Sequence, residues 1–272
     1  MIALDYSAGR PSGGAVRDSG AVAVIRYVGT PGRAKNLTAT ETADMLAHGV
    51  AVALVYEDRA GTALLGRARG EADARAALLD AHSCGVTVRC IYMAVDFDVA
   101  NDDQMDRVSA YLAGAARVLG TDRLGVYGER DVVDIFVGGR VAAYGWQTKA
   151  WSGGAVSSQA DLYQVGRQTT VDGVTCDVNE IKRQDFGQWP APALVTQQHQ
   201  EDDEMVIVTA PNRPAVAYYP VTGMFRTIGE GERTALEAVH QAAGHPAATK
   251  NLTGEQYSEL MDFAGRAARS TQ

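Results

Sequence analysis

Short segments rich in apolar and β-branched residues recur along the first 178 residues, and helical patterns separate the early ones. A strand, a helix and a further strand form the unit from which parallel sheets are built. Eight such strands predict an α/β fold, a closed (β/α)8 TIM-like barrel with reduced helices after the last strands, where the connections are short or polar. An open doubly wound sheet is the alternative. We expect strands at residues 2–6, 21–28, 50–57, 87–95, 123–127, 142–147, 160–165 and 174–178, and helices at 12–18, 39–48, 70–83, 102–119 and 129–137.

The composition changes after the sequence "FGQWP", which ends near residue 190. We therefore expect a barrel domain at residues 1–189 and a linker rich in Pro, Gln and acidic residues at 190–204. Residues 205–272 should form a small α+β module, with strands in "MVIVTA", "AVAYYP" and "GMFRTI" and helices at 230–243 and 254–269. So small a unit buries little apolar core by itself. We expect it to serve docking or oligomerisation, on the barrel, a second copy or a virion partner.

Charge and hydropathy exclude several classes of protein. The formal net charge of −8 is unsuited to a general nucleic-acid binder, which needs a basic face. No segment approaches the roughly 18–20 apolar residues of a membrane helix. The start, "MIALDYSAGR", lacks the basic and apolar regions of a signal peptide. We therefore expect a protein made without a signal peptide, cytoplasmic until released or virion-associated, that acts at the cell wall.

Carboxylates stand where several predicted strands end. In "IYMAVDFDV", residues 91–99, an apolar run is followed by Asp96 and Asp98, and residues two apart in a strand point to the same face. The two acids either cap the next helix or reach the catalytic mouth of a barrel. Acids supply protons and balance an oxocarbenium-like charge, while aromatic rings stack on sugars. The same position recurs on other strands, at Asp5, Glu57, Tyr127, Trp146, Gln147 and Asp177.

Other chemistries find little support in the sequence. None of the five histidines falls at a strand end, which disfavours a His-based triad or a zinc site. Three cysteines without a CxxC pair give neither a disulfide framework nor a metal site. The phosphate-binding and nucleophile-elbow glycine motifs are absent from the sequence. We expect no cofactor and no metal.

Several motifs are specific in their order and spacing: "LDYS" (4–7), "VIRYV" (24–28), "IYMAVDFD" (91–98), "GVYGE" (125–129), "WQTKAW" (146–151) and "CDVNE" through "DFGQW" (176–189). They resemble the glycoside-hydrolase-like barrels often labelled a domain of unknown function, a family related to the family 25 lysozymes, or muramidases. In muramidases a strand-4 Asp-x-Glu motif carries the catalytic acid, helped by aspartates from strands 1 and 8. The resemblance therefore implies that Asp5, Asp96 and Asp177 are supporting aspartates and that Asp98 stands in the place of the glutamate. Its shorter side chain sets the carboxyl group back from the glycosidic oxygen.

Two functions follow from this resemblance. The first is a peptidoglycan-type glycan hydrolase, such as a phage lysin or a virion-borne enzyme, acting on an actinobacterial wall as the Ala-, Gly-, Val- and Arg-rich composition suggests. Its catalytic residues would be Asp5, Asp96, Asp98 and Asp177, and its substrate-binding residues Tyr6, Arg26, Glu57, Tyr127, Trp146 and Gln147. Arg26 either touches a substrate carboxylate or forms a structural ion pair; Trp146 and Trp151 are either a sugar platform or packing. The second function is a catalytically inactive glycan-binding or structural protein of phage assembly on the same barrel.

Overall fold

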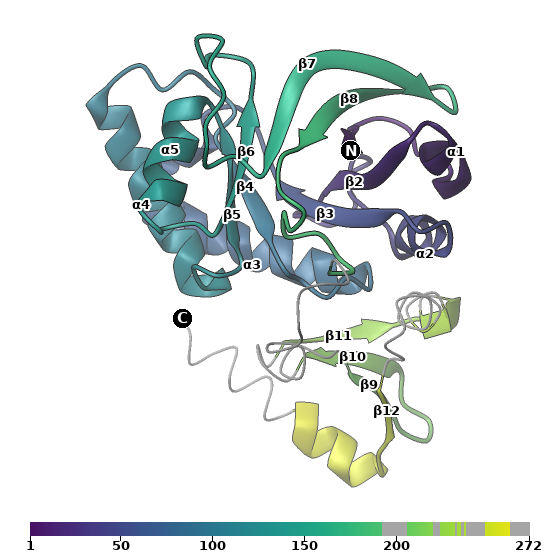
Figure 1. The fold of residues 1–272 in the computed structure, drawn as a ribbon. Coiled ribbons are helices and arrows are strands. Elements are labelled where there is room, and N and C mark those ends of the chain that lie inside the picture. Colours follow the sequence, from purple (N-terminus) through teal and green to yellow (C-terminus); the bar gives the residue numbers. More distant parts are fainter. Residues whose placement is uncertain (192–205, 220–223, 232, 235–236, 238–247, 262–272) are drawn as a thin grey trace.

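The computed structural model describes residues 1–191, 206–219, 224–231, 233–234, 237 and 248–261. Its first domain is a closed eight-stranded barrel in which consecutive strands are neighbours (Figure 1). This confirms the predicted α/β barrel and excludes the open sheet. The strands are β1 (Ile2–Asp5), β2 (Ala21–Tyr27), β3 (Ala51–Tyr56), β4 (Ile91–Ala94), β5 (Leu124–Gly128), β6 (Tyr144–Thr148), β7 (Leu162–Val171) and β8 (Val174–Ile181).

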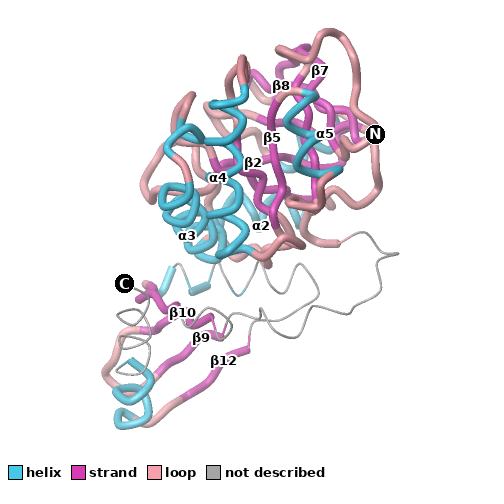
Figure 2. The backbone as a smooth tube through the Cα atoms, turned by 90° about the vertical axis from the view of Figure 1, so that its left-hand side faces the viewer, coloured by secondary structure: helices cyan, strands magenta, loops and turns pink. Residues whose placement is uncertain are grey.

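Helices link the first six strands as predicted and cover the outside of the barrel (Figure 2). The third helix begins three residues earlier than expected, since residues 67–69 belong to it, and a short 3-10 turn, η1 (Thr62–Leu65), precedes it. Helices α2, α4 and α5 pack on the strands through an apolar face, whereas α3 also buries the polar residues Asp73, Asp80 and His82. The helices are α1 (Gly13–Asp18), α2 (Ala39–Ala47), α3 (Arg67–Ser83), α4 (Asp102–Leu119) and α5 (Arg130–Gly138).

The barrel is not wholly parallel, which corrects the expectation of eight parallel strands. Strand β8 is antiparallel to both β7 and β1. The reason is the turn Asp172-Gly173, whose two residues have φ of 52° and 76°. Positive φ at both central positions defines the two-residue turn of a β-hairpin, and so short a connection cannot cross over to a parallel strand. Figure 1 shows β7 and β8 as one long hairpin.

Side chains alternate between the barrel interior and the helix layer. Small residues such as Ala3, Ala23 and Ala53 cluster in the interior with Tyr92 and Trp146, which fill its axis. The neighbouring positions on the same strands belong to a separate apolar cluster shared with the helices. This alternation follows from the period of two in a β-strand. It also decides which polar residues face the barrel mouth.

The second domain is a four-stranded sheet of β9 (Val206–Thr209), β10 (Ala215–Tyr219), β11 (Met224–Ile228) and β12 (Ala248–Asn251). The order is β11-β10-β9-β12, and β12 is a strand that we did not predict. The expected helices at 230–243 and 254–269 and the linker at 190–204 lie partly outside the described residues. Thr253 and Gln256 form a reciprocal capping box, with bonds of 3.0 and 3.2 Å. Among the described residues, no helix has the length and apolar character needed to cross a bilayer.

Candidate active site

A polar cavity of about 180 Å³ opens at the end of the barrel where the parallel strands finish. In α/β barrels this end carries the active site. Four carboxylates from four different strands or strand ends contribute to it, together with three aromatic rings. The lining residues are Asp5, Tyr27, Val55, Glu57, Ala94, Asp96, Tyr127, Trp146, Gln164 and Asp177.

Strand register brings Asp5 and Asp177 together, although 172 positions separate them in the chain. The two residues are direct partners in the antiparallel pair of β1 and β8. Partners in such a pair have Cα atoms about 4.5–5.5 Å apart. The reversed direction of β8 places the first half of that strand, with Asp177, at the same rim as the end of β1. The β7–β8 hairpin therefore places Asp177 in the cavity beside Asp5.

Asp5 is the most buried of the four acids, with 4% of its surface exposed. Its Oδ2 accepts hydrogen bonds from Asn179 Nδ2 at 2.7 Å and from Gln164 Nε2 at 3.0 Å. Burial raises the pKa of Asp5 to about 7, and the charge of Asp177 acts in the same direction, although the two amide hydrogen bonds favour the carboxylate. Near neutral pH this group is therefore present in both protonated and ionised forms.

Asp96 faces a mixed set of charges. Burial raises its pKa, the nearby charge of Glu57 raises it further, and the charge of Lys35 lowers it. The Lys35 ammonium forms an ion pair with Glu57 at 3.2 Å and lies 4.2 Å from the centre of the Tyr27 ring. Asp96 is partly exposed, and its carboxylate forms no hydrogen bond within the described part of the chain. It is therefore a carboxyl group available to a ligand.

The aromatic wall is held by a chain of hydrogen bonds. Tyr127 donates to Gln164 Oε1 at 3.0 Å, so the amide of Gln164 is oriented with its nitrogen toward Asp5. Trp146 donates through Nε1 to Asn179 Oδ1 at 2.8 Å, and its ring lies 4.5 Å from that of Tyr127. Because the amides of Gln164 and Asn179 both donate to Asp5, these rings and amides form a single connected network. The network fixes the walls of the cavity.

Asp98 lies outside the cavity, contrary to the expectation that it shares a face with Asp96. The side chain of Asp98 is exposed. Burial raises the pKa of Glu129, at the start of α5, and the nearby charge of Asp98 raises the pKa of Glu129 further. The expectation failed because β4 ends at Ala94, two residues before Asp96. Alternation of side chains holds only while the backbone stays extended in the sheet.

Three of the predicted substrate-binding residues, Tyr6, Arg26 and Gln147, also lie away from the cavity lining. Arg26 is fully buried and pairs with Glu41 of α2 at 2.7 Å, and Tyr6 donates to the same carboxylate at 2.8 Å. The structural ion pair is therefore the role that the structure gives to Arg26. Gln147 is buried and bonds to the backbone of the loop after β6. All three stand one position away from an inward-facing residue, and so they point to the helix side.

The same alternation identifies residues that we missed. Tyr27 follows Arg26 and faces inward, and Gln164 and Asn179 lie on the inner faces of β7 and β8. Applying the period of two from the small interior alanines outward would have found them in the sequence. Lys35 carried no such signal, because it lies in a loop and reaches the site only through the fold.

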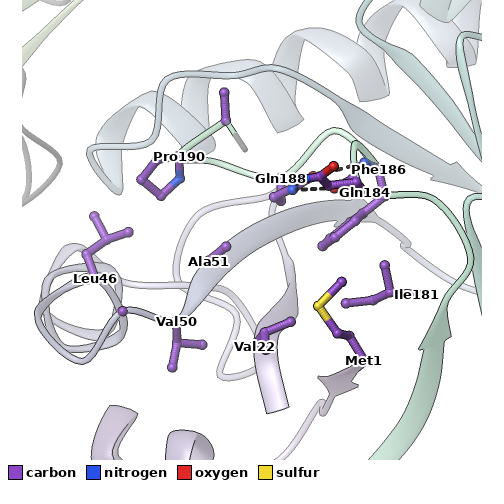
Figure 3. A pocket seen from close by; sticks show the side chains of 12 residues that line it. Met1, Val22, Leu46, Val50, Ala51, Ile181, Gln184, Phe186, Gln188 and Pro190 are labelled. Atoms are coloured by element: carbon purple, nitrogen blue, oxygen red, sulfur yellow. Dashed lines mark hydrogen bonds between the residues drawn. The ribbon is translucent and has the colours of Figure 1, made fainter. Parts of the chain in front are cut away.

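A second, larger pocket of about 340 Å³ lies at the opposite end of the barrel (Figure 3). Apolar side chains such as Met1, Val22, Phe186 and Pro190 surround it. The side-chain amide of Gln188 donates to the backbone carbonyl of Gln184 and accepts from Phe186 N, both at 2.9 Å. None of the described residues that line it carries a carboxylate. The clustered carboxylates therefore lie in the smaller cavity at the other end, which is the candidate active site.

The model of the "Rv2525c-like, glycoside hydrolase-like domain" family matches residues 14–204, more than half of the chain. The chain belongs to this family. The match spans most of the barrel, and the resemblance expected from the sequence motifs is confirmed.

Two comparisons within the family extend the match. The "Putative peptidoglycan hydrolase Rv2525c" of Mycobacterium tuberculosis (strain ATCC 25618 / H37Rv) is 32% identical over 199 residues, which cover 68% of this chain and 82% of that protein. The crystal structure of the same Tat-secreted protein in complex with HEPES superposes with a TM-score of 0.64 at 30% identity, covering 69% of this chain and 98% of that one. An uncharacterized B. stearothermophilus protein shares the fold, with a TM-score of 0.51 at 20% identity, covering 67% and 96%.

These relatives correct the expected location. We expected a protein that stays in the cytoplasm until release or travels with a virion. The family relative from M. tuberculosis is a Tat-secreted protein, and this finding contradicts the expectation. The expectation was wrong because it rested only on the composition of the first ten residues.

Proposed function

We propose that this protein is an exported glycan hydrolase that cleaves a peptidoglycan-type sugar chain in the cavity of Asp5, Glu57, Asp96 and Asp177. The observation that carries the proposal is the convergence of four carboxylates and three aromatic rings in one cavity, with the pKa raised at two of the acids. Glycoside hydrolysis needs a protonated carboxyl group beside carboxylates that balance positive charge. The name of the M. tuberculosis relative supports the same substrate class.

In this proposal Asp96 donates the proton to the glycosidic oxygen. Its carboxyl group is partly exposed to the cavity, and its pKa is raised by burial and by Glu57, as a general acid requires. Asp177 and Glu57 stabilise the positive charge that develops on the sugar ring. Asp5, held by two amides, orients the substrate from the floor of the cavity.

A non-catalytic glycan-binding function is the second candidate, and a specific observation favours it. Asp98 matches the position of the muramidase glutamate, yet it is exposed and does not line the cavity. A barrel without this acid in its cavity would still bind a glycan but would not hydrolyse it. A role in a phage particle stays a prediction.

The deciding experiment measures reducing ends released from purified actinobacterial peptidoglycan by the wild type, Asp96→Asn and Asp98→Asn. The proposal expects release by the wild type, a loss of about 100-fold or more in Asp96→Asn, and little change in Asp98→Asn, since general acid catalysis contributes about 10²–10⁴-fold. If only Asp98→Asn loses the release of reducing ends, Asp98 and not Asp96 is the general acid. No release by any protein, with peptidoglycan pull-down that Asp96→Asn weakens, would establish the binding function instead.

A further inference from the structure

Trp151 differs from the other two tryptophans of the chain. Trp146 and Trp189 have 2% and 1% of their surface exposed and belong to the core, whereas Trp151 is 46% exposed. It lies three residues after the end of β6, in the connection to β7, and therefore on the same side of the barrel as the cavity. Within the described residues its ring forms no hydrogen bond and no contact with another aromatic ring, and nearly half of its surface is open to solvent.

Buried polar side chains hold the connection between β6 and β7, which carries Trp151, through hydrogen bonds. Gln147 donates to Ala155 O at 2.8 Å and accepts from Ser157 N at 2.7 Å. Ser152, next to the tryptophan, donates to Thr148 O at 2.6 Å and accepts from Arg130 N at 3.0 Å. Because these bonds are made by buried groups, the loop is costly to rearrange. The exposed ring therefore stands on a preorganised support.

The backbone of Trp151 has φ of 57°, in the left-handed region. For a residue with a side chain this conformation costs about 1–2 kcal/mol relative to the right-handed one. Gly153 and Gly154, which follow after Ser152, also have positive φ but adopt it at little cost. An exposed aromatic residue held in an unfavourable conformation indicates that its side chain serves a purpose at the surface.

Hydrogen bonds connect this loop to the cavity wall. Gln164, which lines the cavity, accepts from Lys149 N through its backbone at 3.0 Å and from Thr148 Oγ1 through its side chain at 3.3 Å. The same Thr148 Oγ1 accepts from Ala150 N at 3.2 Å. Trp151 is thus one residue away from a segment bonded directly to the site.

We propose that Trp151 is a sugar-binding platform of the same glycan site, stacking on a ring of the chain next to the one held in the cavity; this deepens, and rests on, the glycan specificity proposed above. The cavity, at about 180 Å³, is smaller than the roughly 300–1,000 Å³ of ordinary ligand pockets. It therefore accommodates only a part of a polysaccharide, and adjacent rings must meet the rim. An exposed indole offers an apolar face to such a ring.

Tryptophan fluorescence tests this proposal without requiring catalysis. Trp151 is the one exposed tryptophan of three, so iodide should quench chiefly its emission. Soluble glycan strands, freed of peptides, should reduce that quenching in the wild type. In Trp151→Gly the residual emission should resist iodide with or without glycan, and glycan affinity, measured by calorimetry, should fall about fivefold to tenfold.

Two variants keep the result interpretable. Trp151→Gly suits the left-handed backbone and should not unfold the loop, while Trp151→Phe should restore part of the affinity. Ile135→Ala removes an exposed apolar side chain of α5 and should leave affinity unchanged. Full affinity in Trp151→Gly would overturn the platform even if peptidoglycan is cleaved. Protection and weakened binding without any cleavage would support the platform and refute the hydrolase.

Discussion

The substitution Asp5→Asn tests how ionisation of this buried carboxyl group affects the stability and the activity of the protein. Asn179 and Gln164 both donate to one oxygen of Asp5, and the carbonyl oxygen of an asparagine can accept the same two bonds. Asparagine therefore imitates the protonated acid and carries no charge at any pH. We expect the variant to be more stable than the wild type in alkaline solution and inactive toward glycan.

The magnitude follows from the pKa of Asp5, about 7 in the fold against an ordinary value of 3.8. At 1.36 kcal/mol per unit, this difference corresponds to about 4 kcal/mol. Because the folded pKa is the higher one, the native state binds more protons between pH 3.8 and 7, and stability falls as the pH rises through that window. The loss is absent below pH 3.8 and complete above pH 7.

Urea denaturation at pH 4.5 to 8, followed by tryptophan fluorescence, measures this effect for the barrel, where all three tryptophans lie. The stability of Asp5→Asn relative to the wild type should grow with pH, approaching about 4 kcal/mol at pH 8 as an order of magnitude. Asp106→Asn, at an exposed position of α4, is the control and should follow the wild type at every pH. An Asp5→Asn variant that is less stable than the wild type at pH 8, or a difference that does not change with pH, would refute the reasoning.

Three further predictions test the fold around the site. Arg26→Met removes the buried one of the two cations that pair with Glu41 and leaves that carboxylate only the partly exposed Arg10, so the free energy of unfolding should fall by about 3–5 kcal/mol in urea denaturation; an unchanged midpoint would contradict the buried pair. Gly70→Ala should destabilise the packing of α3 on α4 by about 2 kcal/mol or more, because a Cβ atom there would lie 1.9 Å from the carbonyl oxygen of Tyr111, and thermal unfolding should show it. Lys35→Met should raise the pKa of Asp96 further, since the Lys35 charge lowers it; carboxyl ¹³C titration by NMR would disprove this if the pKa fell or stayed the same.

The sequence by itself determined the elements of the barrel. Apolar runs of strand length and amphipathic helical patterns arise from local periodicity, so β1 to β6 and the helices between them were found close to their expected positions. The concentration of acids at strand ends was also visible, and Asp5, Glu57, Asp96 and Asp177 indeed line one cavity. The signal for the reversed last strand, the dipeptide Asp172-Gly173, was present in the sequence but not used.

Only the tertiary structure decided which face of each strand looks inward. Neighbouring residues of a strand point to opposite sides, one to the barrel interior and the next to the helix layer. Arg26 therefore lies in a buried ion pair on the helix side, and Tyr27 lines the cavity. It also decided where β4 ends, and thereby that Asp96 enters the site and Asp98 does not. The physical reason is that side-chain direction depends on closure of the barrel, to which every strand contributes, whereas the tendency to form a strand depends on its own few residues.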